Sequence, residues 1–567
     1  MRSARIFIAG RFTLLAVFLL LFAPFILVPS ASPSLFAQDY SSGASGQDSQ
    51  QAFTLSGSVV NAATGAPVPR ALVTLYGPRR RSVMSNAEGQ FSFEGVTAGS
   101  MQVGAEKPGY FSEQEMKLRA GNQGAMPETV TVVRESSTVT VKLIPESVIA
   151  GRITENGVGV EGVPVTAMTL EIQDGFRQWA QRGNAVSDED GEFRLAGLTV
   201  GEYYLQIGPK GPEGMGGKGP QSGYGRVFYP GPPAAEGGSP MAVGLGQRAE
   251  MEIGVKREPW FVVSGAVRAT EPVMNWNIQL VDDHGGTLVA GGRHSFETGE
   301  FEMRAPAGNY TLRAMTFARG RASATAMPLT VHGDVTGLQV AVGSGGVIPV
   351  KIKTESAGTK APTTSEWTKV TFGNGRKLSG AGMPPVSIYL RRMGEFEEGR
   401  NLFAAMDESG RPETLAVRGL EPGNYWLEAS NNAPWYVASA ECGGVDLLRE
   451  ELTVTTGAPC AEIDVTLRDD GASLHVSGTW DGDPAQAAVL ILPERAPQQT
   501  ILGQVSKDGD VGFGDLAPGA YNVLLIDRAD GLEYKNPEAM AGHLGKAAHV
   551  TLGAGQEGSV KGELVRR

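Results

Sequence analysis

The stretch that decides the fold is Glu88-Gly-Gln-Phe-Ser-Phe-Glu-Gly-Val-Thr-Ala-Gly99, a polar turn followed by alternating apolar residues. Gly accepts the positive φ that a tight turn needs. The alternation of Phe91 and Phe93 with polar residues is typical of a strand that is buried on one face. A small-residue turn, Ala98-Gly99, then reverses the chain into a second strand. The stretch therefore predicts a β-hairpin.

The same cassette recurs four more times. The later copies end at Gly201, Gly308, Gly423 and Gly519. These glycines lie about 100 residues apart, which is the length of one small β domain. In all four copies a Tyr follows two residues after the Gly, at Tyr203, Tyr310, Tyr425 and Tyr521. We expect each ring to be half-buried with its hydroxyl at the rim, and a ligand platform is the alternative.

Several short segments of the first copy share a further pattern. They are Leu55-Ser-Gly-Ser-Val59, Thr64-Gly-Ala-Pro67-Val68, Ala71-Leu-Val73-Thr-Leu75, Gly89-Gln-Phe91 and Lys107-Pro-Gly109-Tyr110. The second copy keeps part of the pattern at 149–153, 162–165 and 191–193. The pattern resembles the carboxypeptidase regulatory-like domain, a transthyretin-like sandwich of the carbohydrate-binding-like group of folds. The resemblance implies a fold and an accessory role, and it does not imply a catalytic site.

We therefore expect an all-β fold, a tandem array of about five transthyretin/Ig-like β-sandwich domains after an N-terminal signal peptide. Each sandwich should end in a strand that leads within a few residues into the next, which predicts a string of modules with short, semi-rigid joints instead of a single globule. The expected ranges are a signal peptide at 1–37, a flexible linker at 38–52, and sandwiches at 53–145, 146–258 with a Gly/Pro-rich insertion at 208–240, 259–344, 345–470 and 471–567.

The first 37 residues have the features of an export signal. Arg2, Arg5 and Arg11 flank or precede an apolar run from Phe12 to Val28, and Leu35-Phe-Ala37 offers a cleavage site. The run is at the short end for a membrane span, so we expect cleavage, with an uncleaved anchor as the alternative. The chain should be periplasmic, cell-surface or extracellular, with no membrane span after signal removal.

Composition and motifs narrow the function classes. The net charge of −12 disfavours nucleic-acid binding, which needs a basic surface. The six histidines form neither His-x-x-x-His nor His-Glu-x-x-His, and no Gly-x-Ser-x-Gly is present. A Gly-x-Gly-x-x-Gly at 214–219 lies in the Gly/Pro-rich insertion, where chance composition explains it. We expect no enzyme activity, no cofactor and no metal site, with calcium at the acidic turns 188–190 or 508–510 as a minor alternative to plain hairpin turns.

The chain has two cysteines, Cys442 and Cys460. In an exported protein an isolated pair is most simply a disulfide, here joining neighbouring strands of the fourth sandwich. In the chain-entropy model, closing such a loop stabilises the fold by about 3 kcal/mol. Two buried free thiols or a metal site are the alternatives.

If the chain binds a sugar, aromatic rings outside the core should stack on it. The candidates are Trp435, Tyr436, Trp276, Trp179 and the pair Phe228-Tyr229, each with core packing or edge covering as its alternative. The resemblance implies a non-catalytic exported binding or scaffold protein whose partner is a polysaccharide or a cell-surface protein. The alternative is a structural spacer or adhesion stalk that contacts other surface proteins.

Overall fold

The structure is a computed structural model of the chain. It describes residues 53–119, 126–132, 137–212, 221–231, 239–269, 275–282, 287–290, 293–318, 321–342, 346–356, 386–393, 401–406, 414–431, 434–455, 459–478, 487–505, 510–529 and 531–566. The predicted signal peptide and linker lie outside these residues. From Phe53 to Arg567 the chain forms one compact unit. Within the described part, no helix is long and apolar enough to cross a bilayer.

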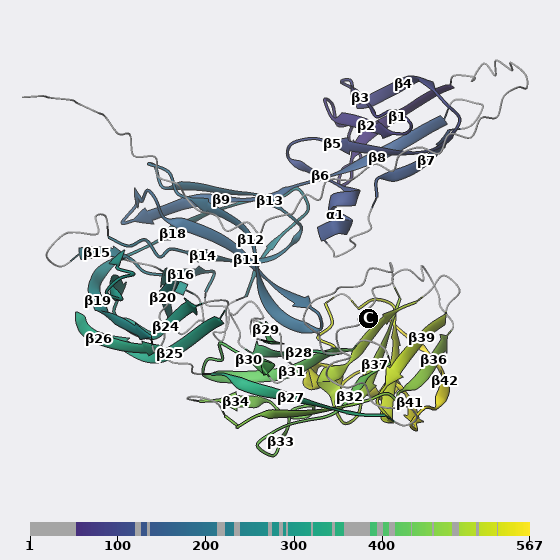
Figure 1. Cartoon of the computed structure of the whole chain (residues 1–567). Coiled ribbons are helices and arrows are strands. Elements are labelled where there is room, and N and C mark those ends of the chain that lie inside the picture. Colours follow the sequence, from purple (N-terminus) through teal and green to yellow (C-terminus); the bar gives the residue numbers. More distant parts are fainter. Residues whose placement is uncertain are drawn as a thin grey trace, which may run out of the picture. The chain divides into compact units, whose positions relative to one another are not determined.

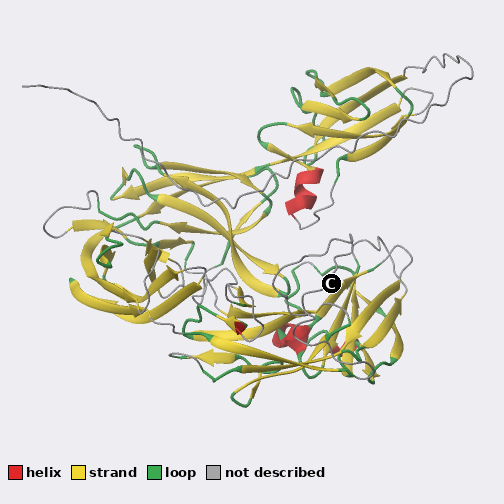
Figure 2. Ribbon diagram, viewed as in Figure 1, coloured by secondary structure: helices red, strands yellow, loops and turns green. Residues whose placement is uncertain are grey.

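The chain is all-β, as predicted, and Figure 2 shows strands throughout the described residues with only short helical segments. Residues 53–145 form two four-stranded sheets. The first has the order β4 (Gln90–Val96), β1 (Phe53–Asn61), β8 (Ser137–Pro145), β6 (Tyr110–Ser112), and the second β3 (Arg81–Met84), β2 (Leu72–Tyr76), β5 (Gly99–Glu106), β7 (Glu128–Val132). Helix α1 (Glu113–Arg119) follows β6 and buries none of its residues. The deciding stretch supplies β4 and the start of β5, which is the predicted hairpin.

Residues 146–258 form a second pair of sheets. One contains β10 (Val158–Gly159), β9 (Ser147–Glu155) and β13 (Glu192–Leu198), with β18 (Arg248–Gly254) beside β9. The other contains β12 (Phe176–Val186), β11 (Pro164–Gln173), β14 (Gly201–Ile207) and β16 (Val227–Tyr229), with β17 (Met241–Val243) beside β14. The Gly/Pro-rich insertion also supplies β15 (Gln221–Tyr224), which pairs with β19 (Arg257–Ala269) and so joins the next sheet along the chain.

Residues 259–344 continue the same architecture. One sheet has the order β15, β19, β23 (Glu300–Pro306), β22 (Arg293–His294), with β26 (Val335–Val342) beside β19. The other has the order β21 (Thr287–Ala290), β20 (Asn275–Asp282), β24 (Gly308–Ala318), β25 (Arg321–Val331).

Residues 345–470 close their two layers into one continuous nine-stranded sheet. Its order is β33 (Val445–Asp446), β32 (Tyr436–Cys442), β35 (Ile463–Arg468), β27 (Ile348–Glu355), β30 (Ala416–Val417), β29 (Asn401–Ala405), β28 (Val386–Met393), β31 (Gly423–Asn431), β34 (Leu452–Val454). Strand β29 pairs with β28 through Phe403 and with β30 through Ala404, so one strand joins the two layers at a corner.

Residues 471–567 form the last pair of sheets. One has the order β39 (Asp510–Leu516), β36 (Ala472–Gly478), β42 (Glu557–Gly562). The other has the order β38 (Ile501–Gln504), β37 (Ala488–Pro493), β40 (Gly519–Ile526), β41 (Ala548–Leu552), with β43 (Leu564–Val565) beside β40. Short helices are η2 (Pro497–Gln499), α2 (Pro537–Met540) and η3 (Leu544–Lys546).

One strand arrangement recurs in all five ranges. Strand β1 lies between β4, to which it is antiparallel, and the closing strand β8, to which it is parallel (Figure 1). The corresponding opening strands are β9, β19, β27 and β36, and their parallel closing strands are β18, β26, β35 and β42. The repeated cassette in the sequence therefore marks a repeated topology.

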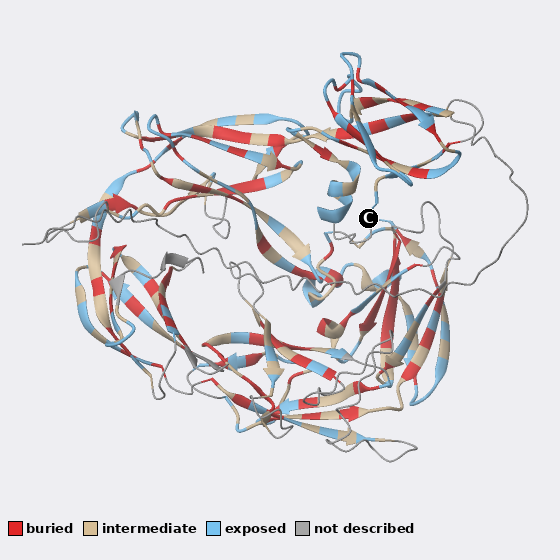
Figure 3. Ribbon diagram, turned by 45° about the horizontal axis from the view of Figure 1, so that its top comes forward, coloured by how far each residue is buried: buried red, intermediate tan, exposed pale blue. Residues whose placement is uncertain are grey.

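The cores follow the alternation of the strands. In β4 the side chains of Phe91 and Phe93 are buried and their neighbours are exposed, and Figure 3 shows the same alternation along other strands. The buried apolar residues that the structure describes group into clusters spanning 55–143, 149–255, 263–342, 348–467, 472–552 and 488–565. Each cluster draws on one predicted range. The predicted domain boundaries themselves stay a prediction.

The four repeated tyrosines are buried more deeply than expected. Their exposed fractions are 2% at Tyr203, 7% at Tyr310, 1% at Tyr425 and 3% at Tyr521. Each hydroxyl donates a hydrogen bond to the backbone carbonyl four residues earlier, at Thr199, Pro306, Glu421 and Ala517 respectively. The half-buried interpretation was wrong because the turn supplies the polar partner that water would otherwise provide. This is the arrangement of a tyrosine corner.

Candidate functional site

The four aromatic residues singled out as possible sugar platforms are buried. Trp179, Trp276, Trp435 and Tyr436 are 7%, 5%, 7% and 3% exposed. The ring of Trp179 packs edge-on against Tyr204, with 5.2 Å between centroids. Trp276 and Trp435 belong to the cores of their own sheets. The structure therefore contradicts the platform interpretation and agrees with core packing, because a ring that is 3–7% exposed offers no face to a sugar.

Two of the candidate aromatics owe their burial to strand register. Trp276 is the second residue of β20, and in that strand every second side chain points inward over the first half. Tyr436 opens β32, and its hydroxyl donates a hydrogen bond to Asp470 Oδ1 at 2.8 Å. Burial and this bond raise the pKa of the Tyr436 hydroxyl. Phe228 and Tyr229, on β16, are partly exposed.

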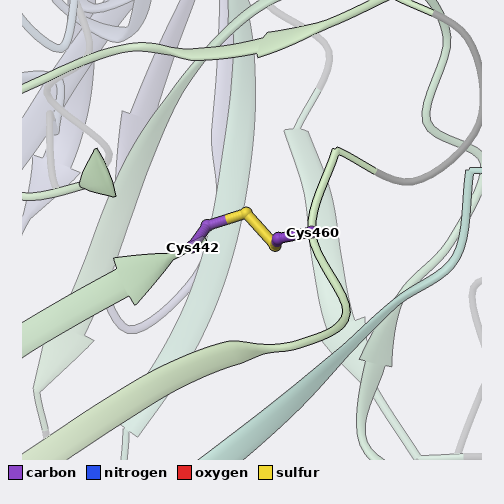
Figure 4. Close-up of a disulfide and its surroundings, with 2 residues drawn as sticks. All are labelled: Cys442 and Cys460. Carbon is purple, nitrogen blue, oxygen red and sulfur yellow. A yellow bond between two sulfur atoms is a disulfide. The ribbon is translucent and has the colours of Figure 1, made fainter. Parts of the chain in front are cut away.

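The predicted disulfide is confirmed. Cys442 ends β32, and Cys460 lies just before β35, with 5.6 Å between the two Cα atoms (Figure 4). Strands β32 and β35 pair so that Cys442 lies opposite Ile463. The bond thus fastens the end of one strand to the entry of its neighbour, close to the expected strand-to-strand link.

The acidic turn at Asp188 serves the hairpin. Its Oδ1 accepts hydrogen bonds from the backbone amides of Asp190 and Glu192, at 3.1 and 2.8 Å. The carboxylate thus caps its own turn, as Asp commonly does. Across the described ranges, no group of three or more His, Cys, Asp or Glu stands together in a way that could hold a metal ion. Asp508, in the other acidic turn, lies outside them.

A buried network of charged groups surrounds Glu428, on β31. Arg391 Nε donates to Glu428 Oε1 at 2.7 Å, and the Tyr389 hydroxyl donates to Oε2 at 2.7 Å. Lys535 Nζ donates to the same Oε2 at 3.2 Å. The Glu428 side chain is 4% exposed. Burial acts to raise the pKa of Glu428, but the charge of Lys535 and the bonds from Tyr389 and Arg391 outweigh it and lower that pKa.

The tip of the β11–β12 hairpin meets this network. Asp174 and Gly175 both have positive φ, 51° and 81°, as a two-residue type I′ turn requires. The buried ring of Phe176 follows, with the cations of Arg391 and Lys535 lying 4.7 and 5.1 Å from its centroid. The Lys535 amide also donates to the Gly175 carbonyl at 3.2 Å.

These contacts, with two more ion pairs, join residues of four predicted ranges beyond their joints. Arg177, beside the tip, forms an ion pair with Glu533. Glu421 accepts from Arg392 at 2.7 Å and lies 3.2 Å from Arg313, which comes from the preceding range. The predicted string of modules with short, semi-rigid joints did not include these contacts. Alternating hydrophobicity reports which face of a strand is buried and carries no record of such distant partners.

A basic hollow of about 610 Å³ opens on the last range. The described residues that line it are Arg528, Gly531, Gly542, His543, Lys546, Val565 and Arg566. They come from the segment after β40, from the turn and 3₁₀ helix after α2, and from the end of β43. Arg528, Lys546 and Arg566 are exposed basic residues, and none of the described lining residues is acidic. The hollow is a candidate site for a negatively charged group.

The sequence did not predict this hollow. One available signal was Asn536-Pro537, which predicts a helix start between two strand patterns. In the structure the Asn536 side chain accepts a hydrogen bond from the Glu538 amide, and Pro537 is the first residue of α2. The cations themselves are spread over 39 positions from 528 to 566, and no spacing rule brings them together before the fold is known.

Comparison with known proteins gives one family match. Residues 54–143 match the carboxypeptidase regulatory-like domain, which confirms the resemblance of the first copy. No curated protein matches the chain.

Solved structures give weak similarities. The Bacillus anthracis TIE protein is 12% identical with a TM-score of 0.17, covering 52% of this chain and 50% of its own. The minor pilin GBS52 of Streptococcus agalactiae is 13% identical with a TM-score of 0.18, covering 36% of this chain and 97% of its own. The major pilin subunit BcpA of Bacillus cereus is 11% identical with a TM-score of 0.16, covering 52% and 99%.

Proposed function

We propose that this chain is a non-catalytic, exported binding or scaffold protein built from tandem β-sandwiches. The observation that carries the proposal is the fivefold recurrence of one topology, an opening strand held between a hairpin strand and a parallel closing strand. Such a chain presents a series of similar modules. The match of residues 54–143 to a domain named for its likeness to a regulatory part of carboxypeptidases supports an accessory role.

Export is supported by two independent features. The N-terminal sequence has the charge and apolar pattern of a signal segment. The disulfide between Cys442 and Cys460 belongs to an oxidising compartment, because cytosolic thiols are kept reduced. The proposed location is the periplasm, the cell surface or the extracellular space.

The proposed partner is a polysaccharide or a cell-surface protein. Since Trp179, Trp276, Trp435 and Tyr436 are buried, a sugar would have to be bound through polar contacts at another surface. A structural spacer or adhesion stalk is the second candidate. The buried network around Glu428 and the hairpin tip favours it, since these contacts hold separate ranges against one another.

The two candidates differ in what they retain. The chain from Gln38 onward is incubated with a panel of insoluble neutral and acidic polysaccharides, and retention is measured against bovine serum albumin. A binding protein is retained by at least one polymer and released by its soluble form. A spacer shows no retention on any polymer. If the network around Glu428 holds the ranges of a spacer together, Glu428→Gln should change its scattering profile. Turnover of a substrate by the purified chain would refute the non-catalytic proposal.

A further inference from the structure

We propose that the basic hollow binds an anionic group, a carboxylate or a sulfate ester, presented by an acidic polysaccharide or by a free anion of the same chemistry. The polysaccharide form rests on the proposed function. The described residues that line the hollow all lie between Arg528 and Arg566.

The walls of the hollow stand on a core of their own. Beneath the lining residues lies a cluster of buried side chains that includes Leu532, Met540 and Val565. Strand β43 pairs in parallel with β40, which fixes Arg566 beside the segment that carries Arg528. The lining cations are therefore attached to packed elements, which reduces the ordering cost of binding.

Charge favours an anion at this position. Three exposed basic residues, Arg528, Lys546 and Arg566, line a hollow in a chain whose net charge is −12. A group of basic residues is therefore unusual in this acidic chain. Guanidinium and ammonium groups bind carboxylate and sulfate oxygens by charge-assisted hydrogen bonds. His543 lines the same hollow.

Space at the hollow suits a sugar-sized ligand. Its volume of about 610 Å³ lies within the range of ordinary small-molecule sites. Two of the lining residues are glycines, and a Cβ added at Gly531 or Gly542 would meet no heavy atom within 4 Å. The backbone there borders open space. Gly542 has no positive φ, so a larger side chain at that position can enter the hollow without backbone strain.

The test uses the chain from Gln38 onward with alginate as the carboxylate polymer, dextran as the neutral polymer and inorganic sulfate as the free anion. Two variants alter the hollow, Arg528→Glu/Lys546→Glu by charge and Gly542→Leu by bulk. Each has a matched control in the same range and outside the lining, Arg495→Glu/Lys561→Glu and Gly545→Leu. Circular dichroism and thermal midpoints establish that every variant is folded. Gly542→Leu keeps the test decisive if charge reversal unfolds the range.

We expect alginate to bind and dextran not to bind. Reversing two cations removes two attractions and adds two repulsions, so binding should weaken about tenfold, and salt should weaken it further. Gly542→Leu should also weaken it, while both controls bind as the native chain does. Sulfate that binds or competes only when the hollow is intact supports the anion site. Sulfate binding without alginate binding assigns the site to a free anion and counts against the glycan part of the proposed function.

Alginate binding that survives both hollow variants would overturn the inference, as would equal losses in the controls, since that would reflect net charge alone. The absence of both alginate and sulfate binding would overturn it too. Retention on a neutral polysaccharide that is indifferent to the hollow variants would overturn this inference while supporting the proposed function, so the two failures are distinguishable.

Discussion

Removal of one hydroxyl, by Tyr425→Phe, should destabilise the 345–470 range. Tyr425 is 1% exposed, and its hydroxyl both donates to the Glu421 carbonyl at 2.9 Å and accepts from the Glu421 amide at 3.1 Å. Phe fills the same space, so the change opens no cavity and isolates the polar contacts. It leaves two backbone groups of one buried turn without their partner.

The magnitude follows from those groups. Leaving a buried donor or acceptor unsatisfied costs about 1–3 kcal/mol, so we expect a loss of about 2–3 kcal/mol at Tyr425. Tyr310→Phe removes the bond to the buried Pro306 carbonyl and should cost about 1–2 kcal/mol. A loss of about 2 kcal/mol corresponds to about a thirtyfold change in an opening equilibrium.

Hydrogen exchange is the appropriate assay, because a chain with several cores does not unfold in a single two-state step. The amide of Glu421 should exchange faster in Tyr425→Phe, and the thermal transition of this range should fall. Tyr76→Phe is the control, since the structure gives no hydrogen bond to that hydroxyl from the described residues. Unchanged exchange at Glu421, or an equal effect in the Tyr76 control, would refute the role assigned to the corner.

Three further outcomes are expected. Replacing Cys442 and Cys460 by Ala removes a cross-link across a sequence separation of 18 and should destabilise its range by about 3 kcal/mol; calorimetry that places the loss in a different range would contradict this. Because the pKa of Glu428 is lowered from 4.5, its network stabilises the fold above that value and loses this contribution as pH falls below it; thermal midpoints measured on acidification should decline less in Glu428→Gln than in the native chain. Burial raises the pKa of Tyr521 from 10.0 to about 12, so the protonated hydroxyl contributes fully to the stability of the fold below pH 10, and this contribution is lost as pH rises toward 12. In an alkaline titration followed by tyrosinate absorbance, Tyr521→Phe should remove one group that titrates late. Loss of a group that titrates near pH 10 would contradict the assignment.

Local patterns were enough to predict much of this fold. The turn and alternation at Glu88–Gly99 became β4 and β5, and the isolated cysteine pair became a disulfide. These features depend on neighbours in sequence or on composition. The burial of Trp276 could have been predicted, because Trp276, Ile278 and Leu280 share the apolar face of one alternating strand.

The features that were missed all depend on distant partners. The ring of Phe176, at a hairpin tip, contacts the cationic groups of Arg391 and Lys535, which are more than two hundred residues away in the sequence. The pairing of β15 with β19 likewise turns a Gly/Pro-rich insertion into part of a neighbouring sheet. Neither contact produces a periodic pattern in the sequence. The contacts of Phe176 involve single residues, and β15 has only four residues, which is too short for a clear alternation.

The parallel pairing of opening and closing strands has a mechanical consequence. In the first range, β1 begins beside the start of β8, with Leu55 opposite Ser137 and Asn61 opposite Leu143. The chain therefore enters at one end of this two-strand ladder and leaves at the other. Tension applied through the two ends of the range pulls β1 and β8 in opposite directions along their length. The hydrogen bonds between the two strands are then loaded in shear and all at once, instead of breaking one after another.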